Sequence, residues 1–276
     1  MGKAAATEAV LESTRQLSSF RVREILEAVH AEDRHALEAV GAVLPSIEHA
    51  VEILISALEG GGRWFNVGAG TSGRMGALDA AEIPPTFGLP ADRVQAVIAG
   101  GDRALLRAVE GAEDDAEAAH WELRKRELGP GDVVLAISAS GETPFALGSF
   151  DIAHEVGARR LALTCNPESS LAEAAEIAIA PVVGPEVIAG STRMKGGLAQ
   201  KMVLHLLSTS VMVRLGRIDG NLMTNMIPAS AKLRDRGARI VMELAGVDAA
   251  TAADLFESAG GNAAQAVELA LRRSRT

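Results

Sequence analysis

The chain has 276 residues, of which 48% are hydrophobic and 23% charged, a composition typical of a folded globular protein. Its 27 basic and 36 acidic residues give a formal net charge of −9, which argues against a protein that grips a nucleic-acid backbone. We therefore predict no nucleic-acid partner, and an anionic ligand would need a local pocket.

Neither export nor membrane insertion is indicated by the sequence. The first residues lack the apolar core of a signal peptide, and no run reaches the roughly 18 apolar residues of a membrane span. The single cysteine, Cys165, has no partner for an internal disulfide, which fits a reducing compartment. We predict a cytoplasmic protein with no membrane partner.

The N-terminal part divides into an arm and two helices. Residues 1–18 show no clear periodicity and are expected to form a mobile arm or a segment that wraps a partner. Apolar residues then recur every three or four positions, which predicts two helices divided near Pro45 and ending at residues 60–62.

Between residues 63 and 215, short apolar runs alternate with helical segments. The predicted strands are 63–67, 94–100, 132–138, 159–165 and 177–183. The predicted helices are 75–81, stopped by Pro84 and Pro85, then 103–128, 145–157, 171–176 and 195–215. This alternation predicts an α/β three-layer sandwich with a mainly parallel sheet of about five strands.

From about residue 228 the sequence is rich in alanine and predicts a small bundle of three helices. Asp248 and Asn262 are the expected N-caps, and glycines at 246 and 260–261 the expected helix ends. We therefore divide the chain into an arm at 1–18, an α/β domain at 19–226 and a helical domain at 227–276.

A glycine-rich loop, GAGTSG at residues 68–73, carries the first chemical signal. Between a strand and a helix, free backbone N–H groups and the helix dipole favour a phosphate. The G-x-G-x-x-G spacing also occurs in dinucleotide sites, but the next strand is followed only by Asp102 after two glycines, which disfavours a nucleotide. We select Gly70, Thr71 and Ser72 as phosphate-binding residues.

A second loop, SASGETP at residues 138–144, follows another predicted strand. Ser138, Ser140 and Thr143 surround Gly141, so hydroxyls and N–H groups can converge on one phosphate. Either loop alone is explained equally well as a turn that caps a helix. Two such loops after strands of one parallel sheet favour a shared ligand site.

Four longer runs carry a family resemblance: GAGTSGRMGALDAAEIPPTFG (68–88), AVEGAEDD (108–115), ISASGETP (137–144) and GPEVIAGSTRMKGGLAQKMVLHLLST (184–209). They resemble the N-acetylmuramic acid 6-phosphate etherases of the sugar isomerase (SIS) superfamily, from about residue 18 to the end. The resemblance implies an SIS-type phosphosugar domain, a terminal bundle like a ubiquitin-associated domain, and no cofactor.

That family cleaves the ether between D-lactate and C3 of a sugar phosphate. The resemblance implies that a base removes the C2 proton of the opened sugar, an acid protonates the departing lactyl oxygen, and water adds at C3. Glu82 matches the acid, and its apolar surroundings are expected to keep it neutral. Glu113 matches the base, although its acidic neighbours are also typical of a solvated helix face.

The run GSTRMKGG at residues 190–197 supplies further candidates. Lys195 is expected to neutralise a phosphate or the lactyl carboxylate, to bind an acid of a neighbouring subunit, or to begin a helix with exposed charge; Arg193 has the same three explanations. Ser191 and Thr192 are predicted to cap that helix, and Ser191 joins the candidate binding residues. The histidines and Cys165 lack zinc-ligand spacing, so no metal site is predicted.

The resemblance also implies a homodimer with shared sites. The apolar helix at 200–215 is a candidate interface, although core burial explains it equally well. A sugar phosphate is the expected substrate. Two other functions stay open: a non-catalytic phosphosugar sensor and a phosphosugar isomerase.

Several positions depart from the family pattern. Glu142 stands where the family has arginine, and a negative charge beside an anion site weakens phosphate binding unless the side chain points away. Asp219, Asn225 and Ser230 replace a tyrosine, an aspartate and an asparagine, and the N-terminal TEGRNP segment is missing. These changes leave the exact sugar open.

Overall fold

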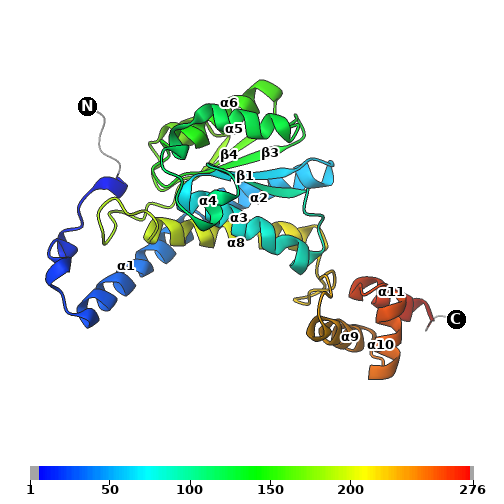
Figure 1. Cartoon of the computed structure of the whole chain (residues 1–276). Helices are drawn as coiled ribbons and strands as arrows, with labels where there is room; N and C mark the ends of the chain where they lie inside the picture. Colours follow the sequence, from blue (N-terminus) through cyan, green and yellow to red (C-terminus); the bar gives the residue numbers. More distant parts are fainter. Residues whose placement is uncertain (1–5, 274–276) are drawn as a thin grey trace. The chain divides into compact units, whose positions relative to one another are not determined.

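The computed structural model describes residues 6–273; the part of the predicted arm that falls on residues 1–5 lies outside this range. The chain folds into two compact units (Figure 1). Unit 1 contains the residues up to Ala80 and Arg93–Ser208, and unit 2 contains Ala81–Asp92 and the residues from Thr209 onward. The sequence-based boundary at residue 226 stays a prediction.

The described part of the arm folds into three short 3-10 turns, Ala6–Glu8, Glu12–Thr14 and Leu17–Ser19. Thr14 is buried, and its Oγ1 donates a hydrogen bond to the carbonyl of Val187 at 3.0 Å. The second turn is therefore attached to the segment around Val187 by a specific long-range contact.

A five-stranded, all-parallel sheet forms the centre of unit 1, with the strand order β2-β1-β3-β4-β5. The strands are β1 (Trp64–Gly68), β2 (Val94–Ile98), β3 (Val133–Ile137), β4 (Arg159–Leu163) and β5 (Ile177–Ile179). Every residue of β1 and β3 is buried, as expected for central strands covered on both faces. The predicted α/β fold class is confirmed.

Helices cover both faces of this sheet. They are α1 (Val22–Ala42), α2 (Leu44–Glu59), α3 (Gly70–Phe87), α4 (Arg103–Leu106), α5 (Ala116–Lys125), α6 (Pro144–Val156), α7 (Ser170–Ala174) and α8 (Lys195–Arg214). In Figure 1, α5 and α6 lie on one side of the sheet, and α2 lies on the other with the unit 1 parts of α3 and α8. Phe145, Phe150 and Leu123 belong to the core that joins α5 and α6 to the sheet. The predicted helix break near Pro45 is confirmed, since Pro45 lies in the first turn of α2.

The predicted bounds of α3 are wrong. Only Ala69 separates β1 from α3, which begins at Gly70 and continues through Pro84 and Pro85 to Phe87. Each proline removes one backbone donor but keeps its carbonyl as an acceptor, and Gly88 donates to the carbonyl of Pro84 at 2.9 Å. Two prolines in the last turn therefore do not stop this helix.

The single helix predicted over residues 103–128 is also wrong. α4 ends at Leu106 and α5 begins at Ala116, with a 3-10 turn at Ala112–Asp114 between them. Gly111, which precedes this turn, has φ +73°, a left-handed conformation that glycine adopts without strain. Glu113 therefore lies in a short turn and not on the face of a long helix.

Unit 2 contains the predicted three-helix bundle, α9 (Ala231–Ala245), α10 (Ala249–Ser258) and α11 (Ala263–Arg273). The helices pack around a core that includes Val241, Leu255 and Phe256. The predicted caps are confirmed: Asp248 accepts hydrogen bonds from the N–H groups of Ala250 and Thr251, and Asn262 from that of Gln265.

Within residues 6–273, no single helix is both long enough and apolar enough to span a membrane. α1 and α2 pass such a test only together, and a bend of 59° separates them. The apolar side chains of α2 are accounted for by core packing, because Ile47, Leu54 and Leu58 are buried.

A hydrogen bond joins α3 to α8 in unit 1. Ser208 Oγ donates to Asp79 Oδ1 at 2.9 Å, while Asp79 Oδ2 is buried with no hydrogen-bond partner among residues 6–273. Burial raises the pKa of Asp79 to about 6, although the bond from Ser208 and the charge of Lys201 oppose the shift. Asp79 therefore loses its proton at a higher pH than an ordinary aspartate does.

This raised pKa makes the stability of the chain depend on pH. The folded-state pKa of Asp79 exceeds its ordinary value of 3.8, so the free energy of unfolding should fall as pH rises from about 4 to 6. Asp79→Asn keeps an acceptor for Ser208 and removes the buried charge. We expect it to raise the free energy of unfolding by about 1–3 kcal/mol at pH 7 and to change it little below pH 4. Denaturant titrations across this range check the prediction, and a constant difference between the two proteins would contradict it.

Candidate functional site

The two loops selected from the sequence line one cavity. Gly68 of β1 is paired with Ile137 of β3, so the loops that follow these strands leave the sheet side by side. The cavity has a volume of about 380 Å³, within the range of small-molecule sites. Its lining includes six of the predicted binding residues, Gly70, Thr71, Ser72, Ser138, Ser140 and Thr143.

The first of these loops is very short. Because α3 begins at Gly70, Thr71 and Ser72 lie in its first turn, where backbone N–H groups have no acceptor in the helix. Gly73 is the first residue of α3 whose N–H donates a hydrogen bond to a backbone carbonyl, that of Ala69, at 3.1 Å. The start of α3 thus offers N–H donors, a serine and a threonine hydroxyl, and the positive end of the helix dipole to an anion.

The second loop gathers three hydroxyls. Ser138 Oγ lies 2.9 Å from Thr143 Oγ1 and 3.3 Å from Ser140 Oγ, and it accepts a hydrogen bond from the N–H of Gly141 at 3.0 Å. Gly141 itself does not line the cavity. Its φ is +74°, and a Cβ there would lie 2.1 Å from Ser169 Oγ, so its role is to shape the loop.

Helix α8 packs closely against both loops. A Cβ at Gly197 would lie 3.0 Å from Cγ2 of Thr71, and a Cβ at Gly196 would lie 3.4 Å from Cβ of Ala139. Gly190, in the segment before α8, also lines the cavity. Two consecutive glycines therefore allow the start of α8 to approach the predicted phosphate loops.

The start of α8 is already occupied by a carboxylate. The N–H groups of Lys195 and Gly196 donate to Glu186 at 3.0 and 2.8 Å, and Glu186 is buried. The predicted cap by Ser191 and Thr192 is therefore wrong. This helix start is neutralised within the chain and is not available to a ligand.

Lys195 is buried and forms an ion pair with Glu32 of α1. Although burial opposes the charge of Glu32, hydrogen bonds with Lys195 and His35 lower the pKa of Glu32. Neither Lys195 nor Ser191 lines the cavity. Of the explanations proposed for Lys195, exposed charge at a helix start is wrong.

Acidic side chains dominate the charge of the cavity. Glu113 and Asp114 line it from the turn before α5, and Glu8 and Glu142 line it from other segments. No lysine or arginine among residues 6–273 belongs to its lining. Neutral N–H and O–H donors are therefore the groups available there to hold an anion.

The charge of Glu142 is directed to a neighbouring helix. Its two carboxylate oxygens accept hydrogen bonds from the backbone N–H and the hydroxyl of Ser170, at 2.9 and 2.7 Å. Ser170 is the first residue of α7. The side chain of Glu142, which replaces the arginine of the family pattern, is thus bonded to Ser170 and not to the hydroxyls of its own loop.

Glu82 belongs to the part of α3 that lies in unit 2, and its side chain is exposed. The expected burial of Glu82 is therefore wrong for the single chain. Glu82 is also absent from the lining of the cavity that holds Glu113.

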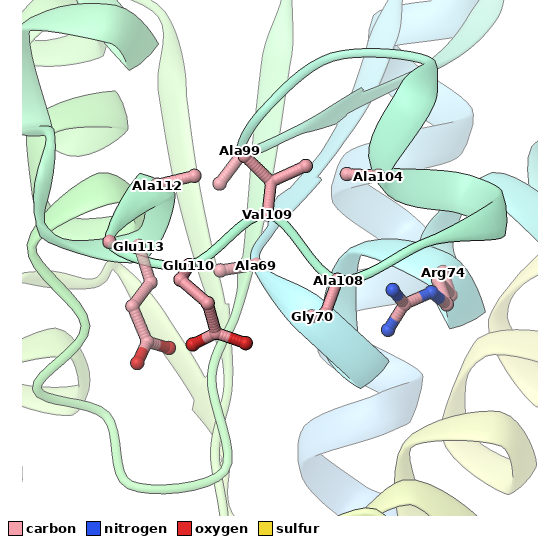
Figure 2. A pocket seen from close by; sticks show the side chains of 11 residues that line it. Ala69, Gly70, Arg74, Ala99, Ala104, Ala108, Val109, Glu110, Ala112 and Glu113 are labelled. Carbon is pink, nitrogen blue, oxygen red and sulfur yellow. The ribbon is translucent and has the colours of Figure 1, made fainter.

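Arg74 was not predicted from the sequence. It lies one helical turn after Gly70 and lines a second hollow of about 150 Å³ that also includes Glu110 and Glu113 (Figure 2). The i, i+4 spacing would have pointed to Arg74 if α3 had been expected to begin at Gly70.

The described residues support neither a metal site nor an activated cysteine. In the described chain, no three His, Cys, Asp or Glu side chains are grouped so as to hold a metal ion. Burial and the nearby charge of Glu186 raise the pKa of the Cys165 thiol to about 12, so this thiol is not activated as a nucleophile.

Comparisons with known proteins agree with the fold of unit 1. Residues 46–154 match the family model of the glucokinase regulatory protein N-terminal SIS domain, and residues 115–210 match the SIS domain. A phosphoheptose isomerase from Francisella tularensis shares the fold with a TM-score of 0.53 at 20% identity, over 70% of this chain and 98% of that one.

Two relatives are similar over nearly the whole chain, and both are named N-acetylmuramic acid 6-phosphate etherase. The protein from Symbiobacterium thermophilum is 48% identical, over 95% of this chain and 87% of its own length. The protein from Pectobacterium atrosepticum is 45% identical, over 94% of this chain and 86% of its own length. The chain belongs to the N-acetylmuramic acid 6-phosphate etherase family.

Proposed function

We propose that this chain is an N-acetylmuramic acid 6-phosphate etherase, a carbon–oxygen lyase that releases D-lactate and leaves N-acetylglucosamine 6-phosphate. One observation carries the proposal beyond family membership: Glu113 lines the same cavity as both hydroxyl-bearing loops. A proton acceptor therefore lies beside a site suited to a phosphate. The cytoplasmic location expected from the sequence is part of this proposal.

In this proposal the phosphate is held by neutral donors. The first turn of α3 supplies N–H groups and the hydroxyls of Thr71 and Ser72, and the second loop supplies Ser138, Ser140 and Thr143. Gly141 gives the second loop its shape. Lys195 acts indirectly, because its ion pair with Glu32 ties the start of α8 to α1.

The reaction proceeds on the opened sugar, whose C1 aldehyde makes the C2 proton acidic. Glu113 removes this proton, and Glu82 protonates the lactyl oxygen as the C3–O bond breaks. Water then adds its hydroxyl at C3, giving a proton back to Glu82, while Glu113 returns a proton to C2. Both glutamates end in their starting protonation states, so the cycle needs no oxidant, reductant or cofactor.

A second copy of the chain is part of the proposal, because Glu82 is exposed on the single chain. The predicted interface on α8 has weak support, since Val203, Leu204 and Leu207 of this helix are buried in the chain itself. α1 is the better candidate. Val22, Leu26 and Leu37 share one face of α1 and are 74%, 64% and 64% exposed.

The catalytic assignment predicts the behaviour of two conservative variants. The wild type should release D-lactate from N-acetylmuramic acid 6-phosphate, and Glu82→Gln and Glu113→Gln should each lower kcat by about 100-fold or more, because each removes one proton-transfer group. Glu117→Gln is the matched control, an exposed acid of the same segment that does not line the cavity. No lactate from the wild type, or undiminished kcat in both variants, would exclude the proposal.

Glu142 predicts a change in phosphate affinity. Glu142→Arg removes a negative charge from the cavity lining and adds a positive one, so we expect N-acetylglucosamine 6-phosphate to bind about three- to tenfold more tightly at low salt. The gain should shrink as ionic strength rises. Ser170→Ala is the control, because it disturbs the partner of Glu142 and keeps the charge. Calorimetric titration measures both, and unchanged affinity in Glu142→Arg would show that this charge does not act on the ligand.

The dimer is tested on α1. We expect the wild type to sediment as a dimer and the double variant Leu26→Glu/Leu37→Glu to shift to monomer with loss of lactate release, because charge on this face opposes burial. Leu106→Glu is the control, since Leu106 is 91% exposed but lies on α4. A monomeric wild type, or a double variant that still pairs, would contradict this interface.

A further inference from the structure

A small hollow adjoins the phosphosugar cavity and has a different chemical character. The two share Ala69, Gly70 and Glu113 in their linings. The larger cavity is lined by hydroxyls and acids, whereas the walls of the hollow are mostly small and apolar: Ala69, Ala99, Ala104, Ala108, Val109 and Ala112. The hollow therefore suits a short apolar group attached to a molecule in the larger cavity.

Arg74 is the one cation among residues 6–273 that lines this hollow. Arg74 Nε donates a hydrogen bond to the carbonyl of Leu105 at 3.3 Å, which leaves the terminal nitrogens of the guanidinium out of this contact. No carboxylate of residues 6–273 forms an ion pair with Arg74, so its two terminal nitrogens remain available for a ligand. A guanidinium whose two terminal NH2 groups are free can form two parallel hydrogen bonds to a planar carboxylate.

The charges are separated along the hollow. In Figure 2, the guanidinium of Arg74 lies on one side of Gly70 and Ala108, and the carboxylates of Glu110 and Glu113 lie on the other. An anionic group is therefore attracted to the Arg74 end and repelled from the Glu113 end. Such a gradient orients a ligand that carries a carboxylate at its tip.

Under the proposed function, on which this inference rests, the substrate carries such a group. We propose that the hollow binds the lactyl substituent of the substrate, with Arg74 pairing with its carboxylate and the alanine walls contacting its methyl group. C3 of the sugar then lies where the hollow meets the cavity, beside the shared Glu113. Arg74 thereby distinguishes a lactyl-bearing sugar phosphate from one that lacks this group.

The test compares two ligands that differ only in the lactyl group. Binding of N-acetylmuramic acid 6-phosphate and of N-acetylglucosamine 6-phosphate is measured by calorimetry in a Glu82→Gln/Glu113→Gln background, in which both proton-transfer groups that cleave the first ligand are removed. Adding Arg74→Met should weaken the lactyl-bearing ligand by about 10- to 100-fold, as expected for loss of charge-assisted hydrogen bonds, and leave the other unchanged. Arg107→Met is the matched control, an exposed arginine of the neighbouring segment outside the hollow.

A second variant tests the volume of the hollow without removing the charge. Ala108 is exposed and lies in the lining, so Ala108→Leu narrows the hollow without entering the core. It should also weaken only the lactyl-bearing ligand. Equal weakening of both ligands by Arg74→Met would overturn the inference, because Arg74 would then hold the shared phosphate or acetamido group.

If the Arg74→Met variant bound both ligands as tightly as its parent does, the proposed lactyl subsite would be excluded as well. These outcomes are separate from the proposed function. A wild type that binds the lactyl-bearing ligand through Arg74 but releases no D-lactate would exclude the lyase and keep the subsite. Release of D-lactate with no effect of Arg74→Met on binding would keep the lyase and exclude the subsite.

Discussion

The pairing of β1 with β3 is the constraint on which the candidate site depends. At the start of the two strands, Arg63 donates to the carboxylate of Asp132 through its backbone N–H, Nε and Nη2, at 2.8, 3.2 and 2.7 Å. Asp132 is buried, so loss of Arg63 would leave an uncompensated charge in the interior. This contact favours one register, in which Gly68 is opposite Ile137. The parallel pairing in turn brings the two hydroxyl-bearing loops to one edge of the sheet, and a shift of one residue would turn the side chains of one strand to the opposite face.

Electrostatics present a second constraint, because an acidic chain must hold an anionic ligand. Two carboxylates close to the site are satisfied within the protein: Glu186 by the first N–H groups of α8, and Glu142 by Ser170. The N–H groups at the start of α3 have no such partner and stay available to a phosphate. Arg74 is the one cation of the described chain that lines the cavity or the adjoining hollow. Groups that attract an anion thus lie at the start of α3, and the neighbouring carboxylates Glu186 and Glu142 are bonded within the protein. The net charge of the chain therefore does not predict the charge of its ligand.

Local patterns in the sequence predicted the strands, the two loops and the caps of the terminal bundle, because those features depend on neighbouring residues. Asp248 caps α10 through residues two and three positions away. The errors involve distant contacts or single backbone conformations. Lys195 is paired with Glu32, 163 positions away, and no local pattern indicates that its charge is buried. The positive φ of Gly111 divides a segment whose composition is helical throughout, and it moves Glu113 from a helix face into the lining of a cavity.

The proposed second copy of the chain would account for two features of the single chain. Acid–base chemistry with two carboxyl groups needs different surroundings for each, yet Glu82 and Glu113 are both exposed here. In α1, a helix of 21 residues, only Ala36 and Val40 are buried, and its apolar face is uncovered. A second copy packed on α1 would bury that face, and it is also the simplest source of cover for the glutamates. Since Glu32 of α1 is paired with Lys195 at the start of α8, a partner packed on α1 would act on an element that contacts both loops of the candidate site. Pairing and catalysis would then be coupled through the same helix.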